Sequence, residues 1–348
     1  MGSLIIAHLS DMHLSRFGER VTAGALWRGD LPRARLVSPV DWTDVEHLDG
    51  WRIQRWSGLP RSPEKGLGFR LIDPTGVRHD RYVTAPGRGH SQRVDEALRK
   101  MRSLVKVRSR ASLQSLCAQH LPPEERAELL KLDRHNTNLR FLEAIDEVRA
   151  MDPEVVVITG DLTDDGYGYE LVLCALKRYI KSGRFFAVAG NHDLSAVPPG
   201  TSHNMPLEDK ASRWSAFRCA AGLGAEQSGS SSLEVDGVFF LGLNSSVKPS
   251  RVPWSGRGRV GKKQLAVAAN LIGRAQDAKA RICCLHHHVA HLRLGPISRA
   301  DPGQFAMKLR DARDVVSLLG SNGFDAVLNG HRHHGYHVHE ADLPHVVS

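Results

Sequence analysis

Short apolar runs alternate with amphipathic segments along most of this chain. The first run, residues 4–8, is followed at once by polar residues, and the later runs are 155–158, 184–189, 238–243, 280–285 and 326–328. Short runs bounded by Gly or polar residues predict buried strands, and the stripes of apolar residues at helical spacing between them predict helices, among them one over 169–181 and one over 304–319. Asp236-Gly237, between two extended runs, predicts a hairpin. The alternation predicts an α/β fold in which polar side chains gather at the carboxyl ends of parallel strands.

The alternation is interrupted between residues 17 and 134. Residues 16–60 show no sustained period, residues 68–83 give two extended runs around a Pro-Thr-Gly turn, and residues 91–116 have the apolar stripe of a helix. A structureless loop of this length is unusual in a compact domain. We therefore expect one domain over residues 1–348, interrupted by a folded insertion at 17–134.

The positive charge of the chain is concentrated in this insertion. The net charge is +9, and residues 14–134 contribute +8 of it. The helix expected over 91–116 carries Arg and Lys on the faces away from its apolar stripe. Such a helix can bind nucleic acid or a membrane surface, and it can equally be the solvent-exposed face of an ordinary cap helix.

Composition and cysteine usage favour a cytoplasmic location. No apolar run approaches the ~18 residues that a membrane span requires, and no secretory leader precedes the first expected strand. The five cysteines are odd in number and show no spacing pattern, so Cys283 and Cys284 are interpreted as small core residues. Residues 346–348 resemble an unfinished strand, so we expect the natural C-terminus to extend further.

Five of the expected strand ends carry oxygen and nitrogen donors. They are Asp11 and His13, then Asp161, then Asn191 and His192, then His286, and finally His331 and His333. Residues at i and i+2 of an extended segment point the same way, so Asp11 and His13 can reach one point. Mixed carboxylate, amide and imidazole ligands suit divalent Mn²⁺, Fe or Zn²⁺. Position along the strand favours His286 over His287 as the ligand, but both remain candidates.

These blocks resemble the calcineurin-like metallophosphoesterase family. The chain contains Asp-x-His, Gly-Asp-x-x-Asp, Gly-Asn-His-Asp, a strand-end His and Gly-His-x-His in that order. The resemblance covers residues 3–16 and about 135–340, and the insertion lies outside it. It implies a two-sheet α/β sandwich with a metal site at the strand ends and an inserted cap.

The resemblance also implies two divalent metal ions, bridged by Asp161. One ion would bind Asp11, His13, Asp161 and His333, and the other would bind Asp161, Asn191, His286 and His331. Two cations ~3.5–4 Å apart suit an in-line displacement at phosphorus and lower the pKa of a water between them.

Three further residues receive roles from the resemblance. His192 would contact the phosphate and protonate the leaving group, and Asp193 would orient His192. Asp164 would position a histidine ligand. Asp164 and Asp193 can also be simple caps of the strand ends.

The resemblance implies a hydrolase of phosphomonoesters or phosphodiesters, with a metal-bridging hydroxide as nucleophile. A cyclic nucleotide or a related phosphodiester is the first expectation for its substrate. DNA, RNA and lipid-linked nucleotide pyrophosphates are alternatives, because the basic insertion can act as a cap that selects by its positive field. A non-catalytic binding module on the same fold is a further alternative, which the complete set of expected ligands disfavours. The sequence does not indicate the oligomeric state.

Overall fold

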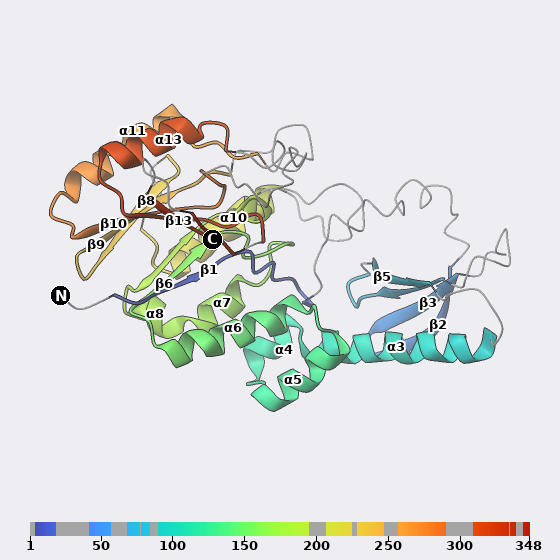
Figure 1. Cartoon of the computed structure of the whole chain (residues 1–348). Helices are drawn as coiled ribbons and strands as arrows, with labels where there is room; N and C mark the ends of the chain where they lie inside the picture. Colours follow the sequence, from blue (N-terminus) through green and yellow to red (C-terminus); the bar gives the residue numbers. More distant parts are fainter. Residues whose placement is uncertain are drawn as a thin grey trace. The chain divides into compact units, whose positions relative to one another are not determined.

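The computed structural model describes residues 4–18, 42–56, 68–76, 78–83, 90–194, 207–224, 228–246, 257–289, 309–333, 335–338 and 344–348. The chain forms two compact units. Unit 1 contains residues 1–15, 141–199 and 205–348, and unit 2 contains residues 16–140 and 200–204. Figure 1 labels the elements of both units.

A three-stranded parallel sheet in unit 1 holds the first three predicted strand ends. Its strands are β1 (Ile6–Leu9), β6 (Val155–Thr159) and β7 (Phe185–Val188), in the order β1-β6-β7. Leu9 pairs with Ile158 and Thr159 pairs with Val188, so the three carboxyl ends lie together. All residues of β6 and β7 are buried, which explains their continuous apolar sequence.

A six-stranded sheet forms the second layer of unit 1. Its order is β12 (His337–Val338), β13 (His345–Val347), β11 (Ala326–Leu328), β10 (Ala280–Leu285), β9 (Val238–Leu243) and β8 (Ser230–Val235). The four inner strands are parallel, and β8 and β12 pair antiparallel at the two edges. The hairpin that the sequence predicts around Asp236-Gly237 is confirmed by the pairing of β8 with β9.

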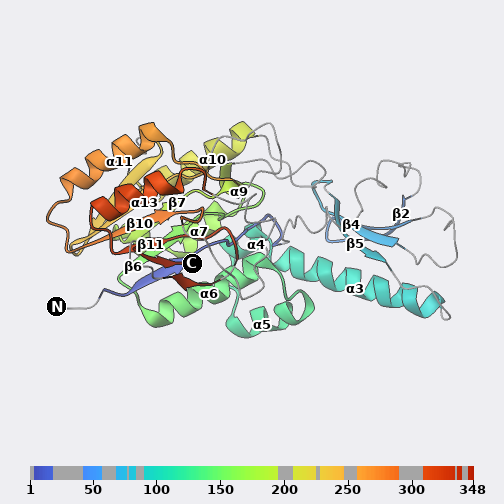
Figure 2. The same cartoon turned by 45° about the horizontal axis from the view of Figure 1, so that its top comes forward.

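The two sheets pack face to face, and alternate residues of β10 face opposite sides. Ile282 and Cys284 belong to the core shared with β6 and β7, and Cys283 and Leu285 belong to the core on the outer face. Helices α11 (Lys262–Arg274) and α13 (Ala312–Ser321) cover that outer face (Figure 2). The predicted two-sheet sandwich and the core role of both cysteines are confirmed.

Further helices of unit 1 lie beside the three-stranded sheet (Figure 1). They are the part of α6 (Thr137–Met151) from residue 141, α7 (Tyr169–Ala175) and α8 (Lys177–Lys181). A single helix was expected over 169–181, but Leu176 (φ −104°) separates α7 from α8. The short α9 (Asn191–Leu194) follows β7, and α10 is Leu207–Ala220. The helix expected over 304–319 begins at Ala312, and residues 304–308 lie outside the described residues.

Unit 2 is a four-stranded antiparallel sheet with helices. The strands follow in chain order as β2 (Trp42–Leu48), β3 (Trp51–Trp56), β4 (Gly68–Ile72) and β5 (Arg78–Val83). Trp51, Ile53 and Leu71 of the sheet pack against Met101 and Val105 of α3 (His90–Arg110). Helices α4 (Leu113–Ala118) and α5 (Pro123–Leu132) complete the unit. The hairpin predicted over 68–83 is confirmed.

Two expectations for this segment are wrong. Residues 42–56 form the hairpin of β2 and β3, although no sustained hydrophobic period was expected there. The rest of the 16–60 stretch, residues 19–41 and 57–60, lies outside the described residues. The turn between them is Asp49-Gly50, and both residues have positive φ. The Asp-Gly dipeptide is a strong hairpin signal, which the sequence-based prediction left out. The helix expected over 91–116 breaks after residue 110, because Ser112 starts α4 by accepting a hydrogen bond from the Ser115 N–H (3.2 Å).

Several basic side chains of α3 are paired within unit 2. Arg102 binds both carboxylate oxygens of Glu46 at 2.8 and 2.9 Å, and Arg110 binds Glu125 through two nitrogens at 2.7 and 3.1 Å. The charge that this helix offers to a partner is therefore smaller than its composition implies. No helix among the described residues has the length and apolar character needed to cross a membrane.

Candidate metal centre

The first candidate residues lie on a turn that runs beside the turn after β6. The Asp11 N–H donates to the Gly160 carbonyl at 3.1 Å, and the His13 N–H donates to the Asp161 carbonyl at 2.9 Å. Asp11 and His13 have φ values of 56° and 49°. The expectation that they converge as i and i+2 residues of an extended chain is therefore wrong. They converge because both turns leave the sheet together.

Left-handed backbone recurs at the candidate ligands. Besides Asp11 and His13, positive φ values occur at Asp161 (52°), His331 (78°) and His333 (55°). This region is uncommon for residues other than glycine, and it is sparsely populated enough to mark a constrained site. Each turn redirects the chain within one residue, so that the side chain points back across the strand ends.

Glycines in the motifs permit backbone contact between these turns. A Cβ atom at Gly190 would lie 2.1 Å from Asp161 Oδ1 and 2.2 Å from the Asp161 nitrogen. A Cβ atom at Gly330 would lie 1.7 Å from Ser10 Oγ and 2.6 Å from Asp11 Oδ2. Both glycines are therefore required by close packing against a candidate carboxylate.

The first cluster of donors contains Asp11, His13, Asp161 and His333. The Nε2 atoms of His13 and His333 lie 3.2 Å apart, and His333 Nε2 lies 3.4 Å from Asp11 Oδ1. His13 Nε2 also lies 3.9 Å from Asp161 Oδ2. On its other nitrogen, His13 donates to Asp164 Oδ1 at 2.6 Å. In the neutral ring, that bond places the proton on Nδ1 and makes Nε2 the nitrogen that can bind a cation.

The second cluster surrounds His286 Nε2. Asn191 Oδ1 lies 3.0 Å from it, His331 Nδ1 lies 3.1 Å from it, and Asp161 Oδ2 lies 3.3 Å from it. His286 Nδ1 donates to the Thr159 carbonyl at 2.8 Å, so in the neutral ring Nε2 is again the nitrogen that can bind a cation. Asp161 Oδ2 is the oxygen that both clusters share.

The donors fit a pair of bound cations. In each cluster two imidazole nitrogens lie 3.1–3.2 Å apart, so a proton or a cation between them is needed to offset the repulsion of their lone pairs. His331 Nε2 is also buried with no hydrogen-bond partner among the described residues. Ligands of one transition-metal ion at ~2.0–2.2 Å have separations close to those found here.

His192 and Asp164 lie side by side at the edge of the first cluster. His192 Nδ1 is 2.8 Å from Asp164 Oδ1, a close contact that is poorly aligned for a hydrogen bond, and His192 Nε2 is 4.0 Å from Asp161 Oδ2. The His192 side chain is 26% exposed, whereas that of His13 is 4% exposed. Solvent therefore reaches the His192 ring more easily than the His13 ring.

Asp193 does not orient His192, which corrects the expectation from the sequence. Its carboxylate accepts hydrogen bonds from the N–H groups of Gly190 (2.9 Å), Thr163 (3.1 Å) and Leu162 (3.3 Å), and from the Tyr169 hydroxyl (3.1 Å). Asp193 therefore fastens the turn after β6 to the turn after β7, and Asp164 occupies the place beside the His192 ring.

The structure also separates the roles of the adjacent histidines. His286 meets Asp161 and Asn191, whereas His287 Nδ1 lies 2.8 Å from Ser245 Oγ. The His287 ring lies beside the His331 ring at an angle of 48°, with centroids 4.4 Å apart. The preference for His286 as the candidate ligand agrees with this geometry.

The sequence profile of calcineurin-like phosphoesterases matches residues 132–335. The chain belongs to the calcineurin-like phosphoesterase family. This family comprises metal-dependent phosphoester hydrolases, and membership indicates a dinuclear divalent metal site, for which the two donor clusters are the candidates. Asp11 and His13 lie outside the matched range, yet hydrogen bonds to residues 160 and 161 bring them into the site.

Two solved structures show similarity to this phosphoesterase-family chain. The purple acid phosphatase PPD1 of yellow lupin is 15% identical over 56% of this chain and 33% of that protein, with a TM-score of 0.38. A dimetal phosphatase of Danio rerio is 15% identical over 59% of this chain and 74% of that protein, with a TM-score of 0.37. The chain thus spans about a third of the lupin enzyme. A search of curated protein sequences found no significant match.

The electrostatics of the phosphoesterase site favour positive charge. Burial would lower the pKa of His13, but the carboxylates of Asp164, Asp161 and Asp11 outweigh it and raise the pKa to about 9. Burial likewise opposes protonation of His286, and Asp161 raises its pKa to about 9. Burial would raise the pKa of Asp161, but the imidazoles hold it well below its usual value. The same field that retains protons there would attract metal ions, which compete with protons for these nitrogens.

Sequence reasoning missed two buried groups that touch this site. Tyr169 donates to Asp193, and burial together with the Asp193 charge raises the pKa of its hydroxyl well above the usual value. Lys210 is fully buried and reaches the backbone beside Asp164 and His192. Neither lies in a motif, and a lone Lys or Tyr in a helix pattern carries no signal of such a contact.

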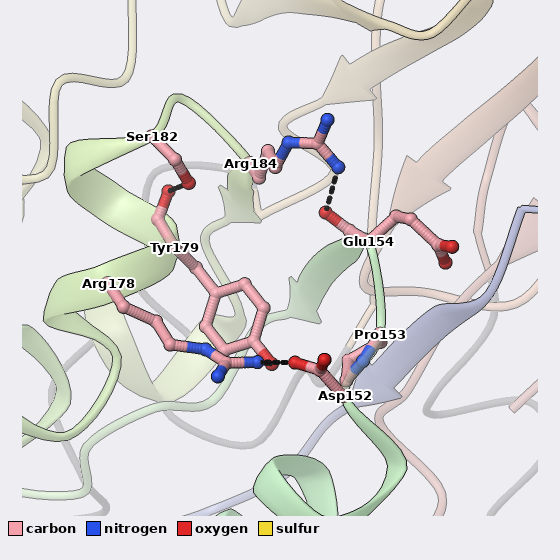
Figure 3. A pocket seen from close by; sticks show the side chains of 7 residues that line it. All are labelled: Asp152, Pro153, Glu154, Arg178, Tyr179, Ser182 and Arg184. Atoms are coloured by element: carbon pink, nitrogen blue, oxygen red, sulfur yellow. Dashed lines mark hydrogen bonds and ion pairs between the residues drawn. The ribbon is translucent and has the colours of Figure 1, made fainter.

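A surface pocket lies at the opposite, amino end of β6 (Figure 3). It is lined by residues 152–154 and by Arg178, Tyr179, Ser182 and Arg184. Arg178 pairs with Asp152, and Arg184 Nη1 donates to the Glu154 carbonyl at 3.4 Å. Its polar groups are already engaged, and it is separated from the phosphoesterase site by the length of the strand.

Proposed function

We propose that this protein hydrolyses a phosphodiester or a phosphomonoester with two divalent metal ions. The observation that carries the proposal is the convergence of two donor clusters on one oxygen, Asp161 Oδ2. His286 Nε2 lies 3.3 Å from this atom, and His13 Nε2 lies 3.9 Å from it on the side of the other cluster. A shared carboxylate of this kind is the arrangement that two-metal phosphoryl chemistry requires.

The proposed ligands follow the two clusters. One ion would be held by Asp11, His13, Asp161 and His333, and the other by Asp161, Asn191, His286 and His331. When bound, such ions activate a water molecule and neutralise the charge that develops on the phosphoryl oxygens. The mixed nitrogen and oxygen donors suit Mn²⁺, Fe or Zn²⁺. Asp164 and the Thr159 carbonyl fix the tautomers of His13 and His286, and so orient their free nitrogens.

His192 is proposed to donate the proton to the leaving oxygen. Its Nδ1 faces Asp164, so the proton available to a substrate is the one on Nε2. As the bond between phosphorus and the leaving oxygen breaks, this proton passes to that oxygen, and a proton from water then restores the imidazole. Asp164 stabilises the protonated ring before transfer by its negative charge.

The substrate we favour is a cyclic nucleotide or another small phosphodiester. Pairing of Arg102 and Arg110 within unit 2 reduces the charge that α3 could offer to a polyanion. A nuclease or a lipid-linked pyrophosphatase remains the second candidate, because residues 17–134 carry the chain's excess of positive charge. Affinity for single-stranded DNA that falls steeply with salt would favour the nuclease. The absence of disulfides at all five cysteines fits the cytoplasmic location that we propose.

Asp161→Asn is the variant that tests the dinuclear mechanism. Replacing the shared carboxylate by a neutral amide should lower hydrolysis of bis(4-nitrophenyl) phosphate by about 100-fold or more and reduce metal content. The measurements are turnover with added Mn²⁺ and metal content per chain by mass spectrometry. Asp277→Asn, at an exposed carboxylate, is the matched control. Turnover of Asp161→Asn near that of the native protein would contradict the mechanism.

A further inference from the structure

A buried lysine ties together the two turns that carry His192 and Asp164. Lys210 lies in the first turn of α10 and has no exposed surface. Its ammonium donates to the Asp164 carbonyl at 2.8 Å and to the His192 carbonyl at 2.6 Å. These two carbonyls belong to the residues whose side chains face each other at 2.8 Å.

The position is unfavourable for a lysine unless these contacts are needed. The amino end of a helix is the positive end of its dipole, so it disfavours a cation. A fully buried lysine is rare and is retained where its charge is compensated. Lys210 lies in the negative field of Asp164, Asp193 and Asp165, while burial lowers its pKa. An apolar side chain could fill the same volume without these costs, but it could not hold two carbonyl oxygens.

Lys210 complements Asp193 across the same pair of turns. Asp193 accepts N–H groups from Leu162 and Thr163 after β6 and from Gly190 after β7. Lys210 donates to carbonyls of the same two turns, at residues 164 and 192. The carboxylate of Asp193 therefore binds the N–H groups of this pair of turns, and the ammonium of Lys210 binds their carbonyl groups. The ammonium thus contacts both His192, the proposed proton donor, and Asp164 beside it.

We propose that Lys210 is a positioning residue that sets the geometry between His192 and Asp164 through their backbone carbonyls. The proposal rests on the function proposed above, in which His192 protonates the leaving oxygen. Without Lys210, the two carbonyls lose a common donor and the imidazole loses its fixed distance to the carboxylate. Ligand residues are also held by contacts that do not involve the residues bound by Lys210, among them those of His286 with the Thr159 carbonyl and of Asp11 with the His331 N–H.

Leaving groups that differ in their need for a proton distinguish this role from general support of the fold. A 4-nitrophenolate departs without protonation, whereas a phenolate departs far more readily with it. The matched substrates are methyl 4-nitrophenyl phosphate and methyl phenyl phosphate, or the corresponding monoesters if the native protein hydrolyses only those. General-acid catalysis typically contributes ~10²–10⁴-fold, so its partial loss is measurable.

The experiment compares Lys210→Met with the native protein on both substrates. Turnover of the phenyl ester should fall by about tenfold or more beyond the fall for the nitrophenyl ester, with the metal content unchanged. Lys210→Gln, which keeps one donor, should show a smaller difference between the esters. Phe217→Leu is the structural control, because Phe217 is buried on the same helix and stacks on Tyr169, and its ring cannot donate a hydrogen bond to either carbonyl.

Three outcomes would overturn the proposal. An equal fall for both esters, as expected of Phe217→Leu, would mean that Lys210 only supports the fold. Failure of both Lys210 variants to fold would mean the same. If the native protein shows no metal-dependent hydrolysis of either ester, the proposed function fails and this inference fails with it. A native protein that is active, with Lys210→Met affecting both esters alike, overturns the inference alone.

Discussion

Substituting Gly190 by alanine is a test of the site that changes no functional group. The added Cβ would lie 2.2 Å from the Asp161 nitrogen and 2.1 Å from Asp161 Oδ1. Because an unstrained van der Waals contact to carbon is about 3.5 Å, the turn after β6 and the turn after β7 must separate by roughly 1 Å or more. Overpacking of this kind costs about 1–3 kcal/mol, which is less than the ~5–15 kcal/mol that stabilises a typical domain. The protein should therefore fold with Asp161 displaced.

Displacement of the shared carboxylate should weaken both proposed metal sites. A shift of about 1 Å in a reacting group can lower a rate by roughly 100-fold. We expect Gly190→Ala to reduce metal-dependent turnover of bis(4-nitrophenyl) phosphate by that order and to require more metal for half-maximal activity. The assays are turnover across a metal titration, and urea unfolding to measure the change in the free energy of unfolding.

Gly273→Ala supplies the matched control for this prediction. Gly273 lies within α11, and no heavy atom stands within 4 Å of an added Cβ there. The same substitution should leave turnover unchanged and raise the free energy of unfolding by roughly 0.5–1 kcal/mol, because alanine favours helix. Native turnover and native metal affinity in Gly190→Ala would refute the view that the glycine exists for close approach to Asp161.

Two further predictions concern neighbours of the site. Burial lowers the pKa of His8 to about 4, against the opposing charge of Asp11, so its contribution to stability is complete above pH 6.5 and lost as the pH falls through 4. When the pH is lowered from 6.5 to 4, the free energy of unfolding of His8→Gln should fall by about 3 kcal/mol less than that of the native protein, as measured by urea unfolding. An equal fall in the two proteins would contradict this prediction. Asp164→Asn removes the carboxylate that His13 Nδ1 binds at 2.6 Å and should lower metal affinity about 10–100-fold in calorimetric titrations, whereas unchanged affinity would show that Asp164 is only a cap.

The sequence predicted the core of unit 1 because its central strands are buried on both faces. The apolar runs at Val155–Thr159 and Ala280–Leu285 can be recognised without tertiary information, and polar residues after them mark the strand ends. The hairpin around Asp236-Gly237 was found by its turn dipeptide. Asp49-Gly50 carries the same signal, but scattered Trp, Pro and Gly in the surrounding stretch concealed the alternation of buried Trp51 and Ile53.

The geometry of the site was less accessible than its composition. Donor types at strand ends can be identified from motifs. The backbone conformation cannot: an extended chain was expected through Asp11 and His13, whereas the backbone there is left-handed. Contacts that depend on distant elements carry no local pattern. One example is that Asp164, and not Asp193, lies beside the His192 ring. The contact of Lys210 of α10 with the His192 carbonyl is another.

The hydrogen bonds of the carboxylates explain how a strained backbone and a shared ligand coexist. Left-handed backbone at a residue other than glycine costs about 1–2 kcal/mol, so each turn needs a contact that holds it. Asp11 provides one by accepting the His331 N–H on both oxygens, at 3.0 and 2.9 Å. Asp161 divides its two oxygens: Oδ1 accepts the His192 N–H at 2.8 Å, and Oδ2 faces the imidazoles of both clusters. The backbone thus fixes the rotation of the Asp161 carboxylate, and with it which single oxygen two metal ions would share.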